Sequence, residues 1–243
     1  MNNKVEKLIK FGAELEISIS EAQGEKLIQY MEEILEINKH INLTRITEED
    51  EFIKRHLLDS LTLLKYIKNP SASILDVGTG GGFPGIPLAI MMEGATITLL
   101  DSTKKKLIVV ENIAKALNIS NIKILHGRAE ELGQDRKYRE SYDIVTSRAV
   151  ANLTLLSEYC LPLTKIGGKF LPMKGREYKS EITEAEKPIA VLGGEIKAME
   201  ECLILQSEWV HVIIVIEKIK KTPRILPRTN GKIKSEKFPL LLK

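Results

Sequence analysis

Asp76 and the glycines that follow it have the types and spacing of a ligand-binding turn. Residues 74–77 form a short apolar run that reads as a buried strand, and Gly78 and Gly80 come directly after it. Pro84 then suits the first turn of a helix. Glycine is needed where a backbone takes positive φ or where a ligand lies against the main chain, and a helix N-terminus offers free N–H groups. The segment therefore predicts a strand, a binding loop and a helix.

Two classes of cofactor bind such a turn. Read from Gly80, residues 80–85 match the G-x-G-x-x-G dinucleotide fingerprint, with Asp101 about 20 residues further on as a ribose contact. Read from Asp76, the acid and residues 78–82 match the loop of class I S-adenosylmethionine-dependent methyltransferases. A carboxylate at the mouth of the loop would repel a pyrophosphate but attract the ammonium of a methionine group. Asp76 therefore favours the methyl donor.

The next two strands would add side chains to the same crevice. Residues 95–101 read as a strand that ends in an acid able to accept both ribose hydroxyls, and Ser102 would cap the following helix. After a third strand, residues 121–126, an N–H near Ala129 could meet an adenine ring nitrogen, and Glu130 could accept from the exocyclic amine. Parallel strands bind ligands beyond their carboxyl ends, where the strand order reverses.

Arg148 follows a fourth strand, residues 142–146, and is expected at the mouth of the crevice. A guanidinium in that place can hold a carboxylate, a phosphate or a guanine edge. A surface ion pair is the alternative interpretation.

The first 70 residues read as helices that precede the sheet. One helix is expected over residues 3–16, a second begins at a Ser20 capping box, and a third begins at Thr47 as N-cap and runs to Asn69. His56 lies at the edge of the apolar stripe of the third helix. That position favours a packed histidine bonded to a neighbour over a catalytic one, and the roles of His56 and Asp59 stay open.

From residue 73 strands alternate with helices, which predicts a mostly parallel sheet. A helix over residues 149–161 and a fifth strand over 169–173 continue the alternation. Residues 195–205 and 209–219 read as an antiparallel strand pair. The resulting seven strands are typical of class I methyltransferases rather than dehydrogenases.

Composition excludes several classes of protein. The 243 residues include no run of eighteen apolar residues and no charged-then-apolar leader, so we expect a cytoplasmic chain that does not enter a membrane. The two cysteines have no metal-ligand spacing, and no metal is expected. The net charge of +3 is concentrated at the end of the chain, since residues 217–243 carry 9 Lys/Arg against 2 Asp/Glu. This basic tail predicts nucleic-acid contact, with a solvated tail as the alternative.

Seven segments carry a pattern that goes beyond the glycine loop. They are residues 42–44, 55–60, 76–88, 100–102 with Lys105 and Lys106, 127–131, 146–149 and 173–175. Together they resemble the RsmG (GidB) family, bacterial methyltransferases that place a methyl group on guanine N7 in small-subunit (16S) ribosomal RNA. The resemblance covers nearly the whole chain and implies a class I, Rossmann-like fold with S-adenosylmethionine as cofactor. It implies methyl-donor binding at Gly78, Phe83, Asp101, Ser102, Ala129, Glu130 and Arg148.

Guanine N7 has an in-plane lone pair and no proton to lose, so its methylation needs alignment rather than a general base. The chain agrees with this, because it has neither an NPPY-type motif after the fourth strand nor a Pro-Cys nucleophile. We therefore expect no catalytic acid, base or nucleophile, with Arg148 as a positioning residue. Phosphate contacts would fall to basic side chains near the end of the sheet and in the tail: Lys174, Arg176, Arg224 and Arg228.

The sequence predicts a helical region over residues 1–70, a methyltransferase domain over 71–219 and a basic tail over 220–243. The partner would be 16S ribosomal RNA or the small ribosomal subunit, and the chain would act as a monomer. Two alternatives stay open: an NAD-dependent oxidoreductase, and a non-catalytic RNA-binding protein with a vestigial pocket.

Overall fold

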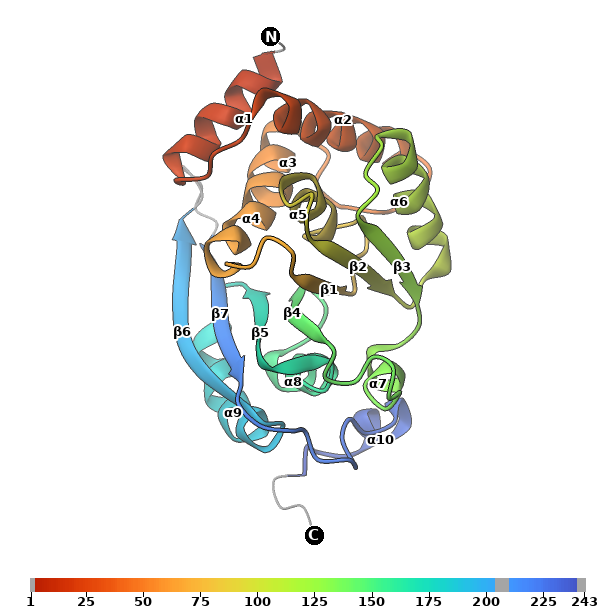
Figure 1. Cartoon of the computed structure of the whole chain (residues 1–243), viewed down its shortest axis with the longest axis vertical. Helices are drawn as coiled ribbons and strands as arrows, with labels where there is room; N and C mark the ends of the chain where they lie inside the picture. The colour runs from red at the N-terminus through yellow and green to blue at the C-terminus, as the bar shows by residue number, and fades with distance from the viewer. Residues whose placement is uncertain (1–2, 204–209, 240–243) are drawn as a thin grey trace.

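A seven-stranded sheet runs through the middle of the molecule, with helices on both faces (Figure 1). The computed structural model describes residues 3–203 and 210–239. The strands are β1 (Ser73–Val77), β2 (Thr96–Asp101), β3 (Ile122–His126), β4 (Tyr142–Arg148), β5 (Thr164–Lys174), β6 (Gly194–Leu203) and β7 (Val210–Lys218). The predicted mostly parallel seven-stranded sheet is confirmed. Of the predicted antiparallel pair, positions 204, 205 and 209 lie outside the described residues.

The strand order is β3-β2-β1-β4-β5-β7-β6, with β7 antiparallel to both of its neighbours. The chain therefore builds outward from β1 to β3 and then returns to place β4 on the other side of β1. Ile74 of β1 pairs with Ile97 of β2 on one side and with Ile144 of β4 on the other. The carboxyl end of β1 is thus the point where the strand order reverses, which is where such sheets bind ligands.

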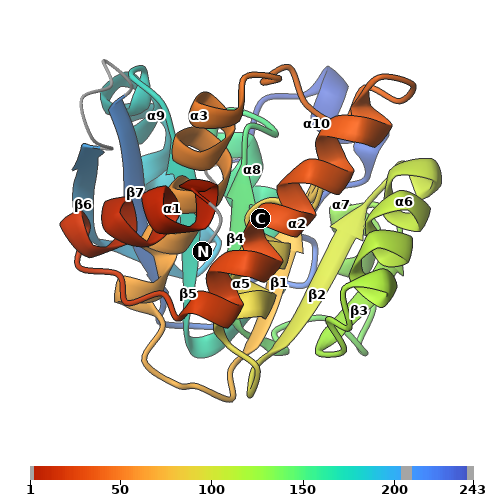
Figure 2. The same cartoon turned by 90° about the horizontal axis from the view of Figure 1, so that it is seen from above.

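Helices cover the two faces of the sheet in separate layers (Figures 1 and 2). On one face lie α5 (Gly85–Met91) and α6 (Lys104–Ala116), with α1 (Asn3–Glu14) and α2 (Glu21–Asn38) outside them. The other face is covered by α7 (Ala129–Leu132), α8 (Leu153–Cys160) and α9 (Tyr178–Val191), and the tail contains α10 (Asn230–Ser235). None of the helices in residues 3–203 and 210–239 is long and apolar enough to cross a membrane.

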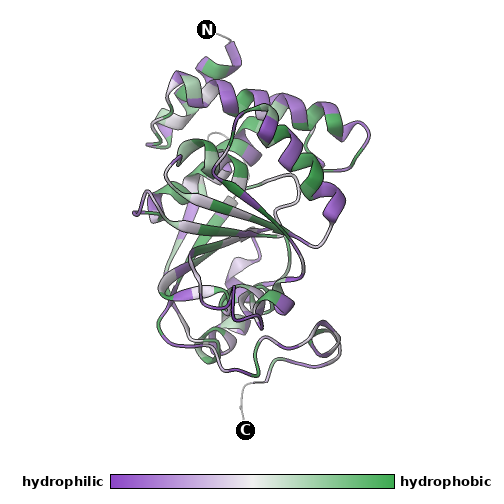
Figure 3. Cartoon of the chain, turned by 45° about the vertical axis from the view of Figure 1, so that its right-hand side comes forward, coloured by the Kyte–Doolittle hydropathy of each residue, from purple (hydrophilic) through white to green (hydrophobic). Residues whose placement is uncertain are grey.

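Each face of the sheet has its own core, because successive side chains of a strand point to opposite faces. Ile74 packs with the N-terminal helices, whereas Leu75 packs with the α8 and α9 side. Figure 3 shows the consequence: the strands between the helix layers are largely hydrophobic, and the outer helices have hydrophilic outward faces. The N-terminal helices and the sheet therefore share one continuous core on one side.

The N-terminal helices differ in part from expectation. The Ser20 capping box is confirmed, since its hydroxyl accepts from Gln23 N at 3.3 Å and Gln23 reaches back to Ser20 N at 3.0 Å. Thr47 is not a cap, because α3 (Glu49–Phe52) begins one residue later with Glu48 in the cap position and no side-chain cap bond. Acids in the first turn of α3 complement the helix dipole instead.

The expected long third helix is one helical stretch with a changed pitch. After α3 it continues as a π-helical turn, η1 (Ile53–Leu58), then α4 (Asp59–Leu61) and a 3₁₀ turn, η2 (Thr62–Tyr66). Turns of π-helix are frequent at functional sites because they displace backbone and side chains from the regular ladder. Here the π-helical turn contains both Arg55 and His56.

Two helix starts after β2 and β4 are corrected, and helices α7, α9 and α10 were not predicted. Helix α6 begins at Lys104 with Thr103 in the cap position and no side-chain cap bond, so Ser102 is not its cap; Asp101 Oδ1 accepts from the amide of Thr103 at 2.8 Å just before the helix. Helix α8 begins at Leu153 rather than at residue 149, with Asn152 as its cap. Helix α9 was missed, since its sequence is highly charged and contains a proline.

Candidate active site

A cleft of about 980 Å³ lies at the carboxyl ends of the parallel strands. It is lined by the glycine loop after β1, the ends of β2 and β4, the start of α7, the loop before α3 and part of η1. Every cofactor residue predicted from the sequence lines it except Asp76: these are Gly78, Gly80, Phe83, Asp101, Ser102, Ala129, Glu130 and Arg148. The topology thus brings together residues spread over 71 positions, from 78 to 148.

The glycine loop has a backbone that only glycine adopts readily. Gly78, Gly80 and Gly82 have φ values of 73°, 56° and 84°. A Cβ on Gly78 would lie 2.4 Å from Val150 Cγ2. A Cβ on Gly80 would meet nothing closer than 3.9 Å, so this loop position borders open space where a ligand can lie against the main chain.

Asp76 is placed differently from the sequence-based expectation. Its side chain is fully buried beneath the loop, where Oδ2 accepts from Thr79 Oγ1 at 2.7 Å and from Gly85 N at 2.9 Å. Its other oxygen has no hydrogen-bond partner in the described part of the chain. Burial outweighs these hydrogen bonds and raises the pKa of Asp76 to about 6. Asp76 therefore fastens the loop from below and does not face an ammonium at its mouth.

Asp101 lies where a ribose contact was expected, and it also holds the loop. Oδ2 accepts from Gly80 N at 3.0 Å, and Oδ1 accepts from Thr103 N at 2.8 Å. A carboxylate oxygen has two acceptor sites, so each oxygen keeps one for a ligand hydroxyl. The residue is 9% exposed at the cleft, and the neighbouring Ser102 is exposed.

The third group of predicted residues, Ala129 and Glu130, lies at the start of α7. Ala129 and Glu130 are its first two residues, so their amides have no acceptor within the helix. Glu130 is 5% exposed, and its Oε1 is buried without a hydrogen-bond partner among residues 3–203 and 210–239. A buried acceptor of this kind is costly unless a ligand donates to it.

Arg148 is largely committed to the protein itself. Its Nη1 donates to the carbonyl of Arg55 at 2.7 Å and to Asp59 Oδ2 at 3.0 Å, and its Nη2 donates to His56 Nδ1 at 2.7 Å. The guanidinium also lies 5.5 Å from the ring centroid of Phe83. Three of its five N–H groups are thus used, and a ligand can meet only the edge formed by Nε and the remaining Nη2 proton.

His56 is packed and hydrogen-bonded, as its place in the sequence favours. Its ring stacks on Phe83 with centroids 4.6 Å apart and planes 13° apart. Because Nδ1 accepts from Arg148, the proton is on Nε2, which lies 2.6 Å from Thr44 Oγ1. Burial and then the charge of Arg148 lower the pKa of His56 to about 3, so the ring is neutral at ordinary pH.

Asp59 connects this network to a residue that sequence reasoning missed. Its Oδ1 is hydrogen-bonded to Nδ1 of His211, the second residue of β7. Burial by itself would raise the pKa of Asp59, but His211 and Arg148 outweigh it and hold the pKa below its usual value. The two partners are 152 positions apart, so the pairing could not be seen in the sequence.

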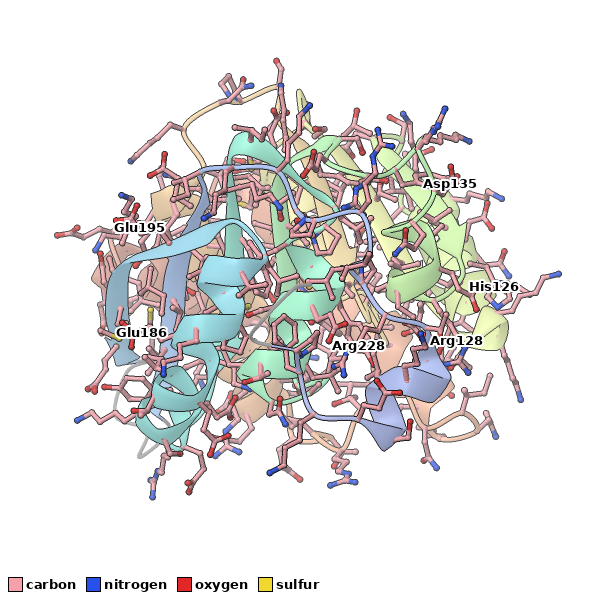
Figure 4. The ribbon with its side chains drawn as sticks, turned by 90° about the horizontal axis from the view of Figure 1, so that it is seen from below. His126, Arg128, Asp135, Glu186, Glu195 and Arg228 are labelled. Carbon is pink, nitrogen blue, oxygen red and sulfur yellow. The ribbon has the colours of Figure 1, made fainter. Side chains whose placement is uncertain are left out.

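The predicted phosphate-binding residues fall into two groups. Lys174 lines the cleft but is paired with Glu181 at 2.7 Å, and Arg176 and Arg224 are exposed. Arg228 is a correction: it bonds to both oxygens of the buried Glu158, at 2.9 and 2.7 Å, and to the carbonyls of residues 236 and 237. Figure 4 shows it on the tail segment that leads to α10. Its side chain fixes the tail and is not available to bind phosphate.

Cations that were not predicted stand around the cleft itself. The lining residues include Arg45, Arg55, Lys106 and Arg128. Arg128 and the neighbouring His126 are labelled in Figure 4. A signal for this group existed in the sequence, since Arg45, Arg55 and Arg128 lie in or beside the family-like segments. Within the described residues, no group of His, Cys, Asp and Glu could hold a metal ion.

Comparisons with known proteins agree with this geometry. A model of a family described as rRNA small subunit methyltransferase G (GidB) matches residues 23–210. The chain is 43% identical over 218 residues to a Clostridium novyi (strain NT) protein named ribosomal RNA small subunit methyltransferase G, covering 89% of this chain and 90% of that protein. A protein of the same name from Alkaliphilus oremlandii (strain OhILAs) is 44% identical over 232 residues, covering 94% and 97%.

Among solved structures, M. jannaschii TYW2 in complex with AdoMet aligns with a TM-score of 0.53 at 15% identity. The alignment covers 67% of this chain and 76% of that one. At such low identity the likeness shows the fold alone.

Proposed function

The chain belongs to the rRNA small subunit methyltransferase G family, and from that premise we propose that it transfers the methyl group of S-adenosylmethionine to N7 of a guanine in small-subunit (16S) ribosomal RNA. Family membership carries the reaction class, the methyl donor and the class of RNA. The choice of N7 is the finer part of the proposal. The observation that supports it most is that the family-like segments meet around one cleft.

The residues of the cleft fit S-adenosylmethionine. Asp101 would accept from the ribose hydroxyls with the acceptor sites that the loop leaves unused. Glu130 would accept from the adenine amine with its unpartnered Oε1, and the amide of Ala129 would meet a ring nitrogen. Gly78 and Gly80 would let the amino acid part of S-adenosylmethionine lie against the main chain. Ser102 and Phe83 are the remaining predicted donor contacts that line the cleft. When bound, S-adenosylmethionine supplies an electrophilic methyl group on a sulfonium sulfur.

The side chains beside the proposed acceptor region support a reaction without proton transfer. His56 is neutral, and both of its nitrogens are engaged, so it cannot remove a proton. Arg148 and Asp59 neutralise one another in a hydrogen-bonded pair. A hydrogen-bonded wall of this kind holds a base in position, which is what attack by an existing lone pair requires. Arg148 is therefore a positioning residue.

Ribosomal RNA would meet the cleft through the cations at its rim. Arg45, Lys106, Arg128 and the exposed Arg176 and Arg224 are the proposed phosphate contacts, and Lys174 takes part only if its pairing with Glu181 opens. Replacing Lys106 by alanine should weaken binding across RNA sequences and reduce the slope of log K against log salt by about 1. Lys115→Ala is the matched comparison, since Lys115 lies on the same helix but does not line the cleft, and it should leave that slope unchanged.

The test of the proposed function is a transfer assay with labelled methyl donor and small subunits that lack the modification. Label should enter the 16S RNA, and calorimetry should show that the same cleft binds S-adenosylmethionine and not NAD. Binding of NAD in place of the methyl donor would support the oxidoreductase alternative. RNA binding without donor binding would support a vestigial pocket.

We also propose that the chain works in the cytoplasm, where its RNA substrate is, and that it acts as a monomer. In residues 3–203 and 210–239 the large exposed apolar side chains lie on separate elements and loops of the structure: Ile108, Val150, Ile166, Met199, Ile219 and Ile225. In functional terms we divide the chain into a helical region over residues 1–70, a methyltransferase domain over 71–219 and a tail over 220–243.

A further inference from the structure

His211 lines the cleft on the side opposite the proposed donor site. Apart from Arg148 at the end of β4, the donor residues come from the loop after β1, from the end of β2 and from the segment after β3, whereas His211 is the second residue of β7, beyond β4 and β5 in the sheet. Because β7 is antiparallel to β5, with Lys174 paired to Val212, its first residues lie at the edge where the parallel strands end. His211 therefore belongs to the half of the cleft that remains for the base to be methylated.

The bonding of His211 fixes what it presents to the cleft. Asp59 accepts at its Oδ1, so Nδ1 of His211 carries a proton. In the neutral ring the lone pair is then on Nε2. This nitrogen has no hydrogen-bond partner within residues 3–203 and 210–239, and the side chain is 5% exposed. An edge of the ring thus offers an acceptor to the cleft.

The neighbouring charged groups do not compete for this role. Arg148 and His211 face the two oxygens of Asp59, and Lys174 is paired with Glu181 at 2.7 Å. Nε2 of His56 bonds to Thr44, so that ring has no free acceptor either. Among these side chains His211 alone combines a fixed tautomer with an unused acceptor.

A guanine that directs N7 toward the methyl donor turns its opposite edge away from it, and that edge carries the N1–H and the amino group. In the transfer the N7 lone pair forms the new N–C bond, and the C–S bond breaks with its electron pair remaining on sulfur. The base becomes a cation, which makes N1–H more acidic and a stronger donor. An acceptor at N1–H is therefore bound more tightly in the transition state than in the substrate. Adenine has a lone pair at N1, which an acceptor would repel.

We propose that Nε2 of His211, held in its tautomer by Asp59, accepts the N1–H of the target guanine. The contact selects guanine over adenine and stabilises the charge that develops on the base. This inference rests on the proposed function, since it takes guanine N7 as the acceptor. The base keeps its proton throughout, so the contact is a hydrogen bond and not general-base catalysis.

The test compares two amide variants of His211. His211→Asn keeps a donor for Asp59 but has no acceptor at the place of Nε2, whereas His211→Gln is long enough to bring its amide oxygen there. His40→Asn is the matched control, since His40 is exposed and does not line the cleft. Thermal unfolding checks folding, calorimetry measures donor affinity, and single-turnover rates are measured with small subunits that lack the modification.

His211→Asn should bind the donor within twofold of wild type but transfer the methyl group about 10- to 100-fold more slowly, as expected for a hydrogen bond to a charged base. His211→Gln should recover part of that loss, and His40→Asn should match wild type. A wild-type rate in His211→Asn would overturn the inference, and so would a His211→Gln no faster than His211→Asn. Mapping the wild-type product separates the two claims, because a methyl group elsewhere than N7 refutes the proposed function whatever the variants do.

Discussion

Replacing Asp101 by asparagine tests the proposed ribose contact without removing the side chain. The carboxylate now accepts from Gly80 N through one oxygen and from Thr103 N through the other, and each oxygen keeps an acceptor site. Asparagine has one carbonyl oxygen, so its amide N–H₂ must face either a backbone N–H or a ribose hydroxyl. The loss of at least one hydrogen bond to a charged acceptor is worth about 1.5–3 kcal/mol. Donor affinity should therefore fall about 10- to 150-fold.

Asp143→Asn is the matched control for this prediction. Asp143, like Asp101, is a strand aspartate with hydrogen-bonded carboxylate oxygens. It accepts from the amide and the hydroxyl of Ser73 at 3.0 and 2.8 Å, but it lies near the amino end of β4, away from the cleft. Both variants should lose some stability in thermal unfolding, and only Asp101→Asn should lose donor affinity in calorimetry. A folded Asp101→Asn protein with wild-type affinity would refute the ribose assignment.

Three further predictions concern the loop, the tail and pH. Gly78→Ala should lower the melting temperature and abolish donor binding, because its φ of 73° is strained for alanine and its Cβ would lie 2.4 Å from Val150; normal donor binding would contradict this. Arg228→Ala should destabilise the fold by about 3–5 kcal/mol in chemical denaturation, since it leaves Glu158 buried and unpaired, whereas a change within about 0.5 kcal/mol would show that the pair is dispensable. The pKa of His56 is about 3 in the folded chain and 6.5 in the free group. Between these two pH values the unfolded chain therefore binds a proton at this residue and the folded chain does not. Stability should fall by about 1.4 kcal/mol per pH unit from this residue between pH 6 and 4, and His56→Gln should show a correspondingly flatter profile.

The fold was predictable because its signals are local. Apolar strands alternating with helices indicated the parallel sheet, and the glycines after β1 indicated the cleft at its carboxyl edge. Helix starts were less certain because several short polar residues compete for each cap. After β2 the cap position falls on Thr103 rather than on Ser102, and its side chain makes no cap bond.

Asp76 indicates the right cofactor class, but the physical reason is not an attraction to an ammonium group. Strand side chains alternate, so Asp76 shares the face of Ile74, which packs under the helices, and it could not point out of the loop. Counting along β1 from its apolar residues would have shown this.

The features that could not be predicted from the sequence are contacts between distant parts of the chain. The Asp59–His211 and Glu158–Arg228 pairs join positions 152 and 70 residues apart. A count of charges in the tail cannot distinguish an arginine that binds phosphate from one that is paired with a buried carboxylate.

Direct determination of the methylated atom tests the central claim most sharply. Small subunits that lack the modification would be incubated with the protein and S-adenosylmethionine, and the 16S RNA digested and its methylated nucleoside identified. We predict 7-methylguanosine at a single position, formed more slowly by the Asp101→Asn protein at donor concentrations that saturate only the wild type. A methyl group on another atom or another base, or no transfer by a protein that binds the donor, would contradict the account.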